Sequence, residues 1–231
     1  TKLNENFGVH TKALPLKNIT QIVCGHARRL EWNVVCPHTK EEEVFVFGNP
    51  PYLGGKLQSK IQKEDQILVL GHLPSFKNLD YISIWFYKAS LYISKTCQSA
   101  FVSTNSIVQG EQVGMLWPHL YTNNVDISFA YKPFKWENNA KYNAGVTCVI
   151  IGLMQKGCDR EKLIFDGTTS KKANSITPYL VEGNSIIVHS SNESISGLPL
   201  MEYGNMPLEG GFLKLNQMEK DNTVMERIRQ D

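Results

Sequence analysis

The sequence has few of the features that mark secreted or membrane proteins. Its 231 residues include five cysteines, an odd number, and no Cys-x-x-Cys pair, so we expect no disulfide framework. No apolar run reaches the roughly 18 residues that a membrane-spanning helix needs, and no signal peptide is recognisable at the start. We therefore expect a cytoplasmic protein without a membrane partner.

The chain also lacks a strong excess of charge of one sign. Its net charge is +2, with 20% charged and 42% hydrophobic residues, which is ordinary for a globular protein. So small a positive charge permits nucleic acid as a partner but does not require it. Charge alone leaves open a protein that binds no nucleic acid.

Short, continuously apolar runs alternate with longer amphipathic segments over the first two thirds of the chain. Buried strands have the continuous pattern, and we expect them at residues 19–24, 44–48, 100–104, 125–130 and 145–153. Helices are expected at residues 79–93 and 111–120, the second limited by Pro118. This alternation predicts an α/β fold with a mostly parallel sheet.

The composition changes after residue 155, where Gly, Asn, Ser and Pro become frequent and only short strand-like pieces such as residues 185–188 remain. Such a change is typical of a linker followed by a less regular unit. We therefore divide the chain into a first domain at residues 1–155, followed by a small β-rich segment within residues 156–231.

The motif Asn49-Pro50-Pro51-Tyr52 directly follows the expected strand at residues 44–48, and ligands of open α/β sheets bind at the carboxyl ends of strands. Consecutive prolines restrict the backbone, so the Asn49 amide and the Pro50 carbonyl can form a rigid pair of acceptors for an amino group. That group's lone pair is then free to attack an electrophile, which is catalysis by positioning. Tyr52 offers a flat face for an extruded base. The alternative is a tight turn in which Asn49 caps a helix.

This motif and four later segments together resemble the MmeI-like adenine-specific DNA methyltransferases of type II restriction-modification systems. The segments are residues 47–56 (FGNPPYLGGK), 80–89 (DYISIWFYKA), 101–107 (FVSTNSI), 134–140 (FKWENNA) and 149–153 (VIIGL). The resemblance implies a partial Rossmann-like class I methyltransferase sheet at residues 1–155. It also implies that residues 156–231 form a linker and the start of a target recognition domain. S-adenosylmethionine would be the methyl donor, without a metal, and a flipped adenine in double-stranded DNA the acceptor.

The resemblance also assigns roles to single residues. Asn49, Pro50, Pro51 and Tyr52 would form the catalytic loop around the flipped adenine, and either Phe134 or Trp136 would stack on its other face. The cofactor contacts would be His26, Ala27, Asn49 and Trp85. His26 and Ala27 belong to residues 24–32 (CGHARRLEW), which resemble the family's loop against the cofactor's adenine.

Three of these roles have competing interpretations. In the family, Asn is common at the position of His26 and Asp at that of Glu31, so the His26 contact departs from the pattern. Trp85 fits simple core packing. The two stacking candidates, which lie among lysines at 132, 135 and 141, fit a solvated loop as well as nucleic acid.

No strand followed by a glycine-rich loop, which in class I methyltransferases holds the methionine part of the cofactor, occurs in residues 1–43. We therefore expect that the first strands and this loop belong to a missing N-terminal part of the same polypeptide. The chain alone should then be inactive, and its exposed sheet edge should favour self-association.

Other site types and functions remain open. The pairs Cys24-x-His26 and Cys36-x-His38 could suggest zinc, but structural zinc sites usually have wider ligand spacings, so we expect no metal. The alternatives to a DNA methyltransferase are an RNA or protein-glutamine methyltransferase and a non-catalytic DNA-binding module.

Overall fold

The computed structural model describes residues 22–39, 41–136, 145–184, 186–191, 216–218 and 220. The chain divides into two compact units, Thr1–Ser190 and Ser191–Asp231. Every helix and strand given below lies in the first unit. The first three residues of the strand expected at 19–24 lie outside the described residues, and residues 22–24 form no strand.

A six-stranded sheet with the order β1-β2-β4-β3-β5-β6 forms the centre of the first unit. Its strands are β1 (Val44–Gly48), β2 (Cys97–Thr104), β3 (Val125–Lys135), β4 (Thr147–Gln155), β5 (Lys162–Asp166) and β6 (Thr169–Ala173). The pairs β1–β2 and β3–β5 are parallel, whereas β2–β4, β3–β4 and β5–β6 are antiparallel. The α/β class is confirmed, but the mostly parallel sheet is wrong. β3–β4 and β5–β6 are successive strands without a crossover helix, and parallel pairing needs such a crossover.

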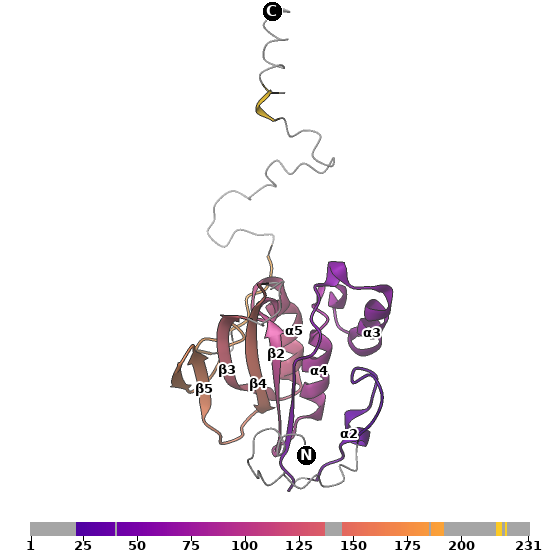
Figure 1. Ribbon diagram of the computed structural model, residues 1–231. Helices are drawn as coiled ribbons and strands as arrows, with labels where there is room; N and C mark the ends of the chain where they lie inside the picture. The colour runs from indigo at the N-terminus through magenta and orange to yellow at the C-terminus, as the bar shows by residue number, and fades with distance from the viewer. Residues whose placement is uncertain are drawn as a thin grey trace, which may run out of the picture. The chain divides into compact units, whose positions relative to one another are not determined.

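Helices pack beside the sheet, as Figure 1 shows for α4 and α5, with α3 next to α4. The helical elements are α2 (Trp32–Val35), α3 (Lys60–Leu70), α4 (Ser83–Tyr92) and α5 (Gly110–Thr122), with 3-10 turns η1 (Gly55–Leu57), η2 (Phe76–Asn78) and η3 (Asn105–Val108). Buried side chains of α4 and α5 join those of β2, β3 and β4 in one core. The helix around Pro118 continues to Thr122, beyond the expected limit, and the Thr122 hydroxyl donates to the Pro118 carbonyl at 2.9 Å.

Three elements of this unit differ from the sequence-based expectation. Helix α3 was not expected, yet it begins with a capping box in which the Ser59 hydroxyl accepts from the Gln62 amide and the Gln62 side chain accepts from the Ser59 amide. Strands β5 and β6 lie beyond the domain boundary placed after residue 155, and they extend the same sheet. Residues 186–188 form no strand. The division at residue 155 remains a prediction.

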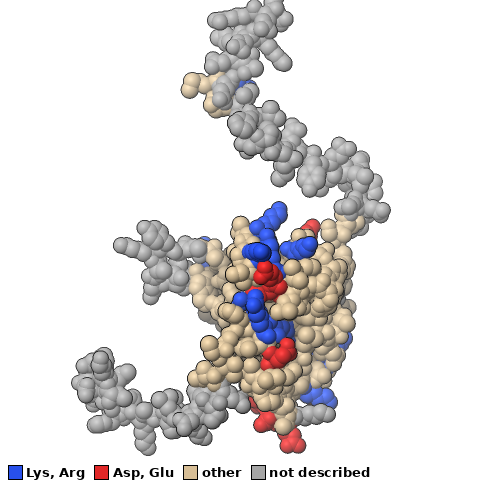
Figure 2. Space-filling view, turned by 90° about the vertical axis from the view of Figure 1, so that its right-hand side faces the viewer, with Lys and Arg blue, Asp and Glu red and all other residues tan. Residues whose placement is uncertain are grey.

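Strand β1 lies at one edge of the described sheet and pairs only with β2 there. Two aromatic side chains on it are exposed, Phe45 at 58% and Phe47 at 81%. Figure 2 looks onto the side where Figure 1 places α3, and Lys and Arg side chains gather over its upper part with acidic ones among them. Across the described ranges, no helix has the length and apolar character to cross a membrane.

Candidate functional site

The segment that follows β1 carries the motif Asn49-Pro50-Pro51-Tyr52. Asn49 is exposed, whereas the adjacent Pro50 is buried. No helix begins at Asn49, since the next helical turn is η1 and its N-cap is Gly54. The alternative in which Asn49 caps a helix is therefore wrong, and the Asn49 side chain is available to a ligand.

The backbone after the motif is held by buried polar side chains. The Leu53 amide donates to the Asp80 carboxylate at 2.9 Å, and Asp80 is 5% exposed. The Gln58 side chain donates to the carbonyls of Leu53 and Leu79, at 2.9 and 3.1 Å. The Gln112 side chain accepts from the Asp80 amide at 2.9 Å, which joins α5 to the same group. These bonds hold Leu53, the residue directly after the motif, to the helical part of the unit, which restricts the motif at its carboxyl end.

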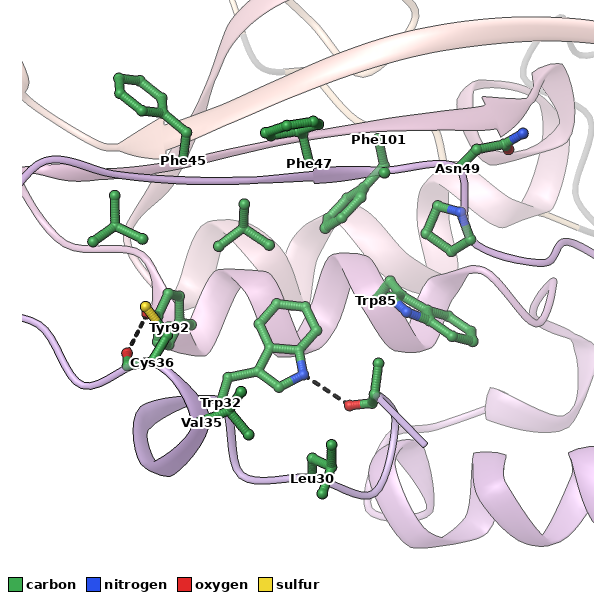
Figure 3. A pocket seen from close by; sticks show the side chains of 15 residues that line it. Leu30, Trp32, Val35, Cys36, Phe45, Phe47, Asn49, Trp85, Tyr92 and Phe101 are labelled. Carbon is green, nitrogen blue, oxygen red and sulfur yellow. Dashed lines mark hydrogen bonds between the residues drawn. The ribbon is translucent and has the colours of Figure 1, made fainter. Parts of the chain in front are cut away.

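A cavity of about 540 Å³ lies beside the end of β1. Four residues expected in the site line it: Ala27, Asn49, Pro50 and Trp85. Its other lining residues are mostly apolar: Leu30, Trp32, Val35, Cys36, Val44, Phe45, Val46, Phe47, Gly48, Tyr92 and Phe101. Figure 3 shows that Phe45 and Phe47 project from β1 away from Trp32, Trp85 and Tyr92. An apolar cavity with few polar groups and two indole rings suits a flat heterocycle.

Trp85 packs in the core and also borders the cavity, so core packing is confirmed and its contact with the cofactor stays a prediction. It is 8% exposed and meets the Tyr81 ring edge-on at 5.4 Å. Trp32, the last residue of the segment 24–32, donates its indole N–H to the Ala27 carbonyl at 2.8 Å (Figure 3). His26 is exposed and is not among the lining residues.

Asp65 on α3 joins the residues before β1 to the helices. Its side chain is 0% exposed and accepts from the guanidinium groups of Arg28 and Arg29, the latter at 2.8 Å. The Tyr81 hydroxyl donates to it at 2.8 Å. Burial alone would raise the pKa of Asp65, but the hydrogen bonds from Tyr81, Arg29 and Arg28 lower it below its usual value. The carboxylate thus anchors the turn that carries Ala27 and Leu30.

Tyr52 and Phe134 both lie next to Cys148 in the structure. The Tyr52 hydroxyl lies 3.9 Å from the Cys148 sulfur, and Cys148 is paired with Phe134 across β3 and β4. Burial raises the pKa of Tyr52, and the contact with Cys148 adds to this effect. The Phe134 and Trp136 rings are 6.4 Å apart and tilted by 40°. Phe134 belongs to β3 and is half-buried, so a solvated loop does not describe it, whereas Trp136 is half-buried and lies directly after the strand. Lys141 lies outside the described residues.

Sequence reasoning missed Asp80, Asp65 and Cys148, and it named Trp32 only as the last residue of the segment 24–32. Asp80 had a usable signal, because it opens one of the segments that carry the family resemblance. Asp65 had none, since a single carboxylate in a helix is usually solvated. Within the described ranges, no cluster of three or more His, Cys, Asp and Glu side chains could hold a metal ion.

Comparisons with known proteins place this site in a DNA-methyltransferase domain. The profile of the family described as "MmeI, DNA-methyltransferase domain" matches residues 1–166. The chain belongs to this family.

Two relatives extend the match along nearly the whole chain. DNA methyltransferase A of Bacillus subtilis (strain 168) is 47% identical over 222 residues, which is 96% of this chain and 25% of that protein. The Type IIL restriction-modification enzyme MmeI, solved in complex with DNA, superimposes with a TM-score of 0.83 at 38% identity. That match covers 97% of this chain and 31% of MmeI. The chain therefore spans about a quarter of one relative and about a third of the other.

Proposed function

We propose that this chain forms the acceptor-binding half of the active site of an adenine-N6 DNA methyltransferase in a restriction-modification protein. The observation that carries the proposal is the anchored loop at the carboxyl end of β1, where Asn49 is exposed beside an apolar cavity. Family membership supports DNA as the substrate.

Two oxygen acceptors in this loop suit an exocyclic amino group. The Asn49 side-chain oxygen and the Pro50 backbone carbonyl accept its two N–H bonds, which leaves the nitrogen lone pair free to attack. S-adenosylmethionine, when bound, supplies an electrophilic methyl group on a sulfonium. The methyl group would pass to this nitrogen as its bond to sulfur breaks, the neutral thioether would leave, and the nitrogen would release one proton to water. No covalent enzyme intermediate is needed, since catalysis comes from orientation and preorganised dipoles.

Two aromatic side chains near Cys148 suit an adenine extruded from a duplex. Tyr52 and Phe134 flank Cys148, and stacking between aromatic faces is how enzymes hold a flipped base. The neighbouring cavity, bordered by Ala27, Trp32 and Trp85, fits the adenine part of the cofactor. His26 is a weaker candidate for that contact than Trp32, because it does not line the cavity.

The donor side of the site is proposed to come from other residues of the same polypeptide. Two observations support this: the chain spans 25% of DNA methyltransferase A, and β1 ends the described sheet with Phe47 81% exposed. An apolar edge strand of this kind normally pairs with another strand. Further strands beside β1 would bring the loop that holds the methionine part of the cofactor.

Product analysis tests this function. The protein extended by the residues encoded upstream is incubated with S-adenosylmethionine and duplex DNA, and the digested nucleosides are separated by mass. We expect N6-methyladenine. N4-methylcytosine as the product would contradict the adenine assignment.

The same assay separates the alternatives. Methylation of RNA or of protein glutamine in parallel reactions, with none in DNA, would favour those substrates. DNA binding by the extended protein without any methylation would favour a non-catalytic module.

A further inference from the structure

A second hollow of about 580 Å³ lies near the proposed base-binding loop. We call it the lysine groove, since its charged lining residues are Lys56, Lys63, Lys77 and Glu111. The elements that form it follow the carboxyl ends of the parallel strands β1 and β2: η1 and α3 come after β1, and α5 comes after β2. The lysine groove is therefore on the side of the sheet where its ligands bind.

Three separate elements hold the lysines around this groove. Lys56 is on η1, Lys63 on α3 and Lys77 on η2. A Cβ atom at Gly55 would lie 2.6 Å from the Lys77 carbonyl oxygen, so the absence of a side chain there lets η1 approach η2 closely. This approach keeps Lys56 and Lys77 near each other and concentrates positive charge.

These three lysines have no ion-pair partner among the described residues. Other lysines of the unit, such as Lys60 and Lys95, also have none, so what sets the three apart is that they line one hollow. Several other cations are paired. Lys171 and Lys172 pair with Glu182 and Glu161, and Arg28 and Arg29 share Asp65. Within the groove only Glu111 opposes the three positive charges. Exposed Lys and Arg side chains gather on this side of the molecule, as Figure 2 shows. Uncompensated charge in a hollow attracts an anionic ligand.

We propose that the lysine groove binds the phosphodiester backbone of the DNA strand that carries the flipped adenine. The inference rests on the proposed function, and it names residues that hold the substrate outside the base pocket. Lys56 belongs to the same anchored loop as Tyr52, which is tied to Asp80 through Leu53. Each strand of a duplex carries one phosphate per about 3.4 Å of helix axis. A base held at Tyr52 therefore brings its neighbouring phosphates to this loop.

The binding of duplex DNA as a function of salt tests the groove. The full chain and a triple variant, Lys56→Gln with Lys63→Gln and Lys77→Gln, are titrated with a fluorescently labelled duplex at several salt concentrations. Each phosphate contact contributes about 0.9 to the slope of log K against log salt. We expect the triple variant to lose about 0.9 from this slope for each lysine that contacts a phosphate, with lower affinity for every duplex sequence.

A second triple variant controls for net charge. Lys95→Gln, Lys171→Gln and Lys172→Gln remove the same charge at other places, since Lys95 precedes β2 and the other two lie on β6 at the far edge of the sheet. This variant should keep the slope of the unchanged chain.

Each other result overturns the proposal in a distinct way. Equal slopes for the two triple variants would show that the groove contacts no phosphate, while the proposed function would stand. If the Lys56, Lys63 and Lys77 variant loses affinity for poly-glutamate but keeps its affinity for the duplex, the groove binds an acidic protein instead of DNA. If the unchanged chain binds no duplex at any salt concentration, the groove proposal fails. If the extended protein of the product assay nevertheless methylates DNA, the proposed function survives that failure.

Discussion

At the scale of single residues, the members of the motif Asn49-Pro50-Pro51-Tyr52 differ in how exposed they are to solvent. Asn49 is exposed, whereas Pro50 is buried and Tyr52 half-buried. A substitution at Asn49 therefore changes the chemistry of the loop without opening the core. Pro50 contributes a backbone carbonyl, which no side-chain substitution removes.

Replacing Asn49 with Ala should abolish most methyl transfer. In the extended protein, Asn49→Ala removes one preorganised acceptor, and the loss of one such contact typically lowers the rate about 10²- to 10³-fold. Cofactor affinity, measured by titration calorimetry, should change little. Asn174→Ala, at an exposed residue in another part of the unit, is the matched control and should keep the full rate. A rate near wild type for Asn49→Ala would remove the loop from the catalytic site.

Tyr52 should report base flipping. A fluorescent adenine analogue at the target position should brighten when the extended protein binds, and Tyr52→Ala should weaken this response because stacking contributes about 1–3 kcal/mol per base. Tyr52→Phe keeps the ring and loses only a weak contact to Cys148 at 3.9 Å, so it should behave like the unchanged protein. A response in Tyr52→Ala as strong as in Tyr52→Phe would make the ring structural.

The sequence was informative where the chemistry is local. Asn49, Pro50 and Tyr52 are adjacent, and their types alone indicate an amino-group site at the end of a strand. Asp80, by contrast, contacts Leu53 across 27 positions, and only the packing of the chain brings the two together. The contact between Tyr52 and Cys148 likewise joins residues that are far apart in the sequence.

At the scale of elements, α3 is tied to the residues before β1 through Asp65. Its carboxylate is the shared acceptor of Arg28, Arg29 and Tyr81, so the turn beside the cavity depends on one buried charge. The pattern of apolar residues gave β1, β2, α4 and α5 correctly, because continuous apolar runs and helical spacing report burial. It did not predict β5, β6 or α3, because these elements are only partly buried and their apolar patterns are therefore weak.

Asp65→Ala should destabilise the protein in a pH-dependent way. Removing one partner of a buried ion pair costs about 3–5 kcal/mol, and chemical denaturation at neutral pH measures the loss. The folded-state pKa of Asp65 is lowered, so its stabilisation is complete above the unfolded-state pKa, about 3.9. It disappears as the pH falls through the folded-state value. The difference between the two proteins should therefore shrink below about pH 4.

Tyr81→Phe is the control for this substitution. It removes one hydrogen bond to Asp65 and keeps both arginine contacts, so the cost should be about 1 kcal/mol. If Asp65→Ala costs no more than Tyr81→Phe, the carboxylate does not anchor the turn.

At the scale of the whole molecule, the open edge of β1 should govern assembly. Phe45 and Phe47 are exposed on it at 58% and 81%, and apolar edge strands tend to pair with other chains. We expect the isolated chain to self-associate, with a mass by light scattering above that of the monomer. Phe47→Lys, a charge at the edge, should shift it toward monomer, whereas Leu91→Lys on α4, also exposed, should not. If both variants have the same mass, the chain does not self-associate through the edge of β1.

We expect this chain to hold the methyl acceptor, while the methyl donor depends on other residues of the polypeptide. Titration calorimetry with S-adenosylmethionine compares the chain alone with the extended protein. Clear binding by the extended protein and little or none by the chain is the expected result, because half of the site cannot hold the cofactor's methionine part. Micromolar binding by the chain alone, as a monomer, would contradict it.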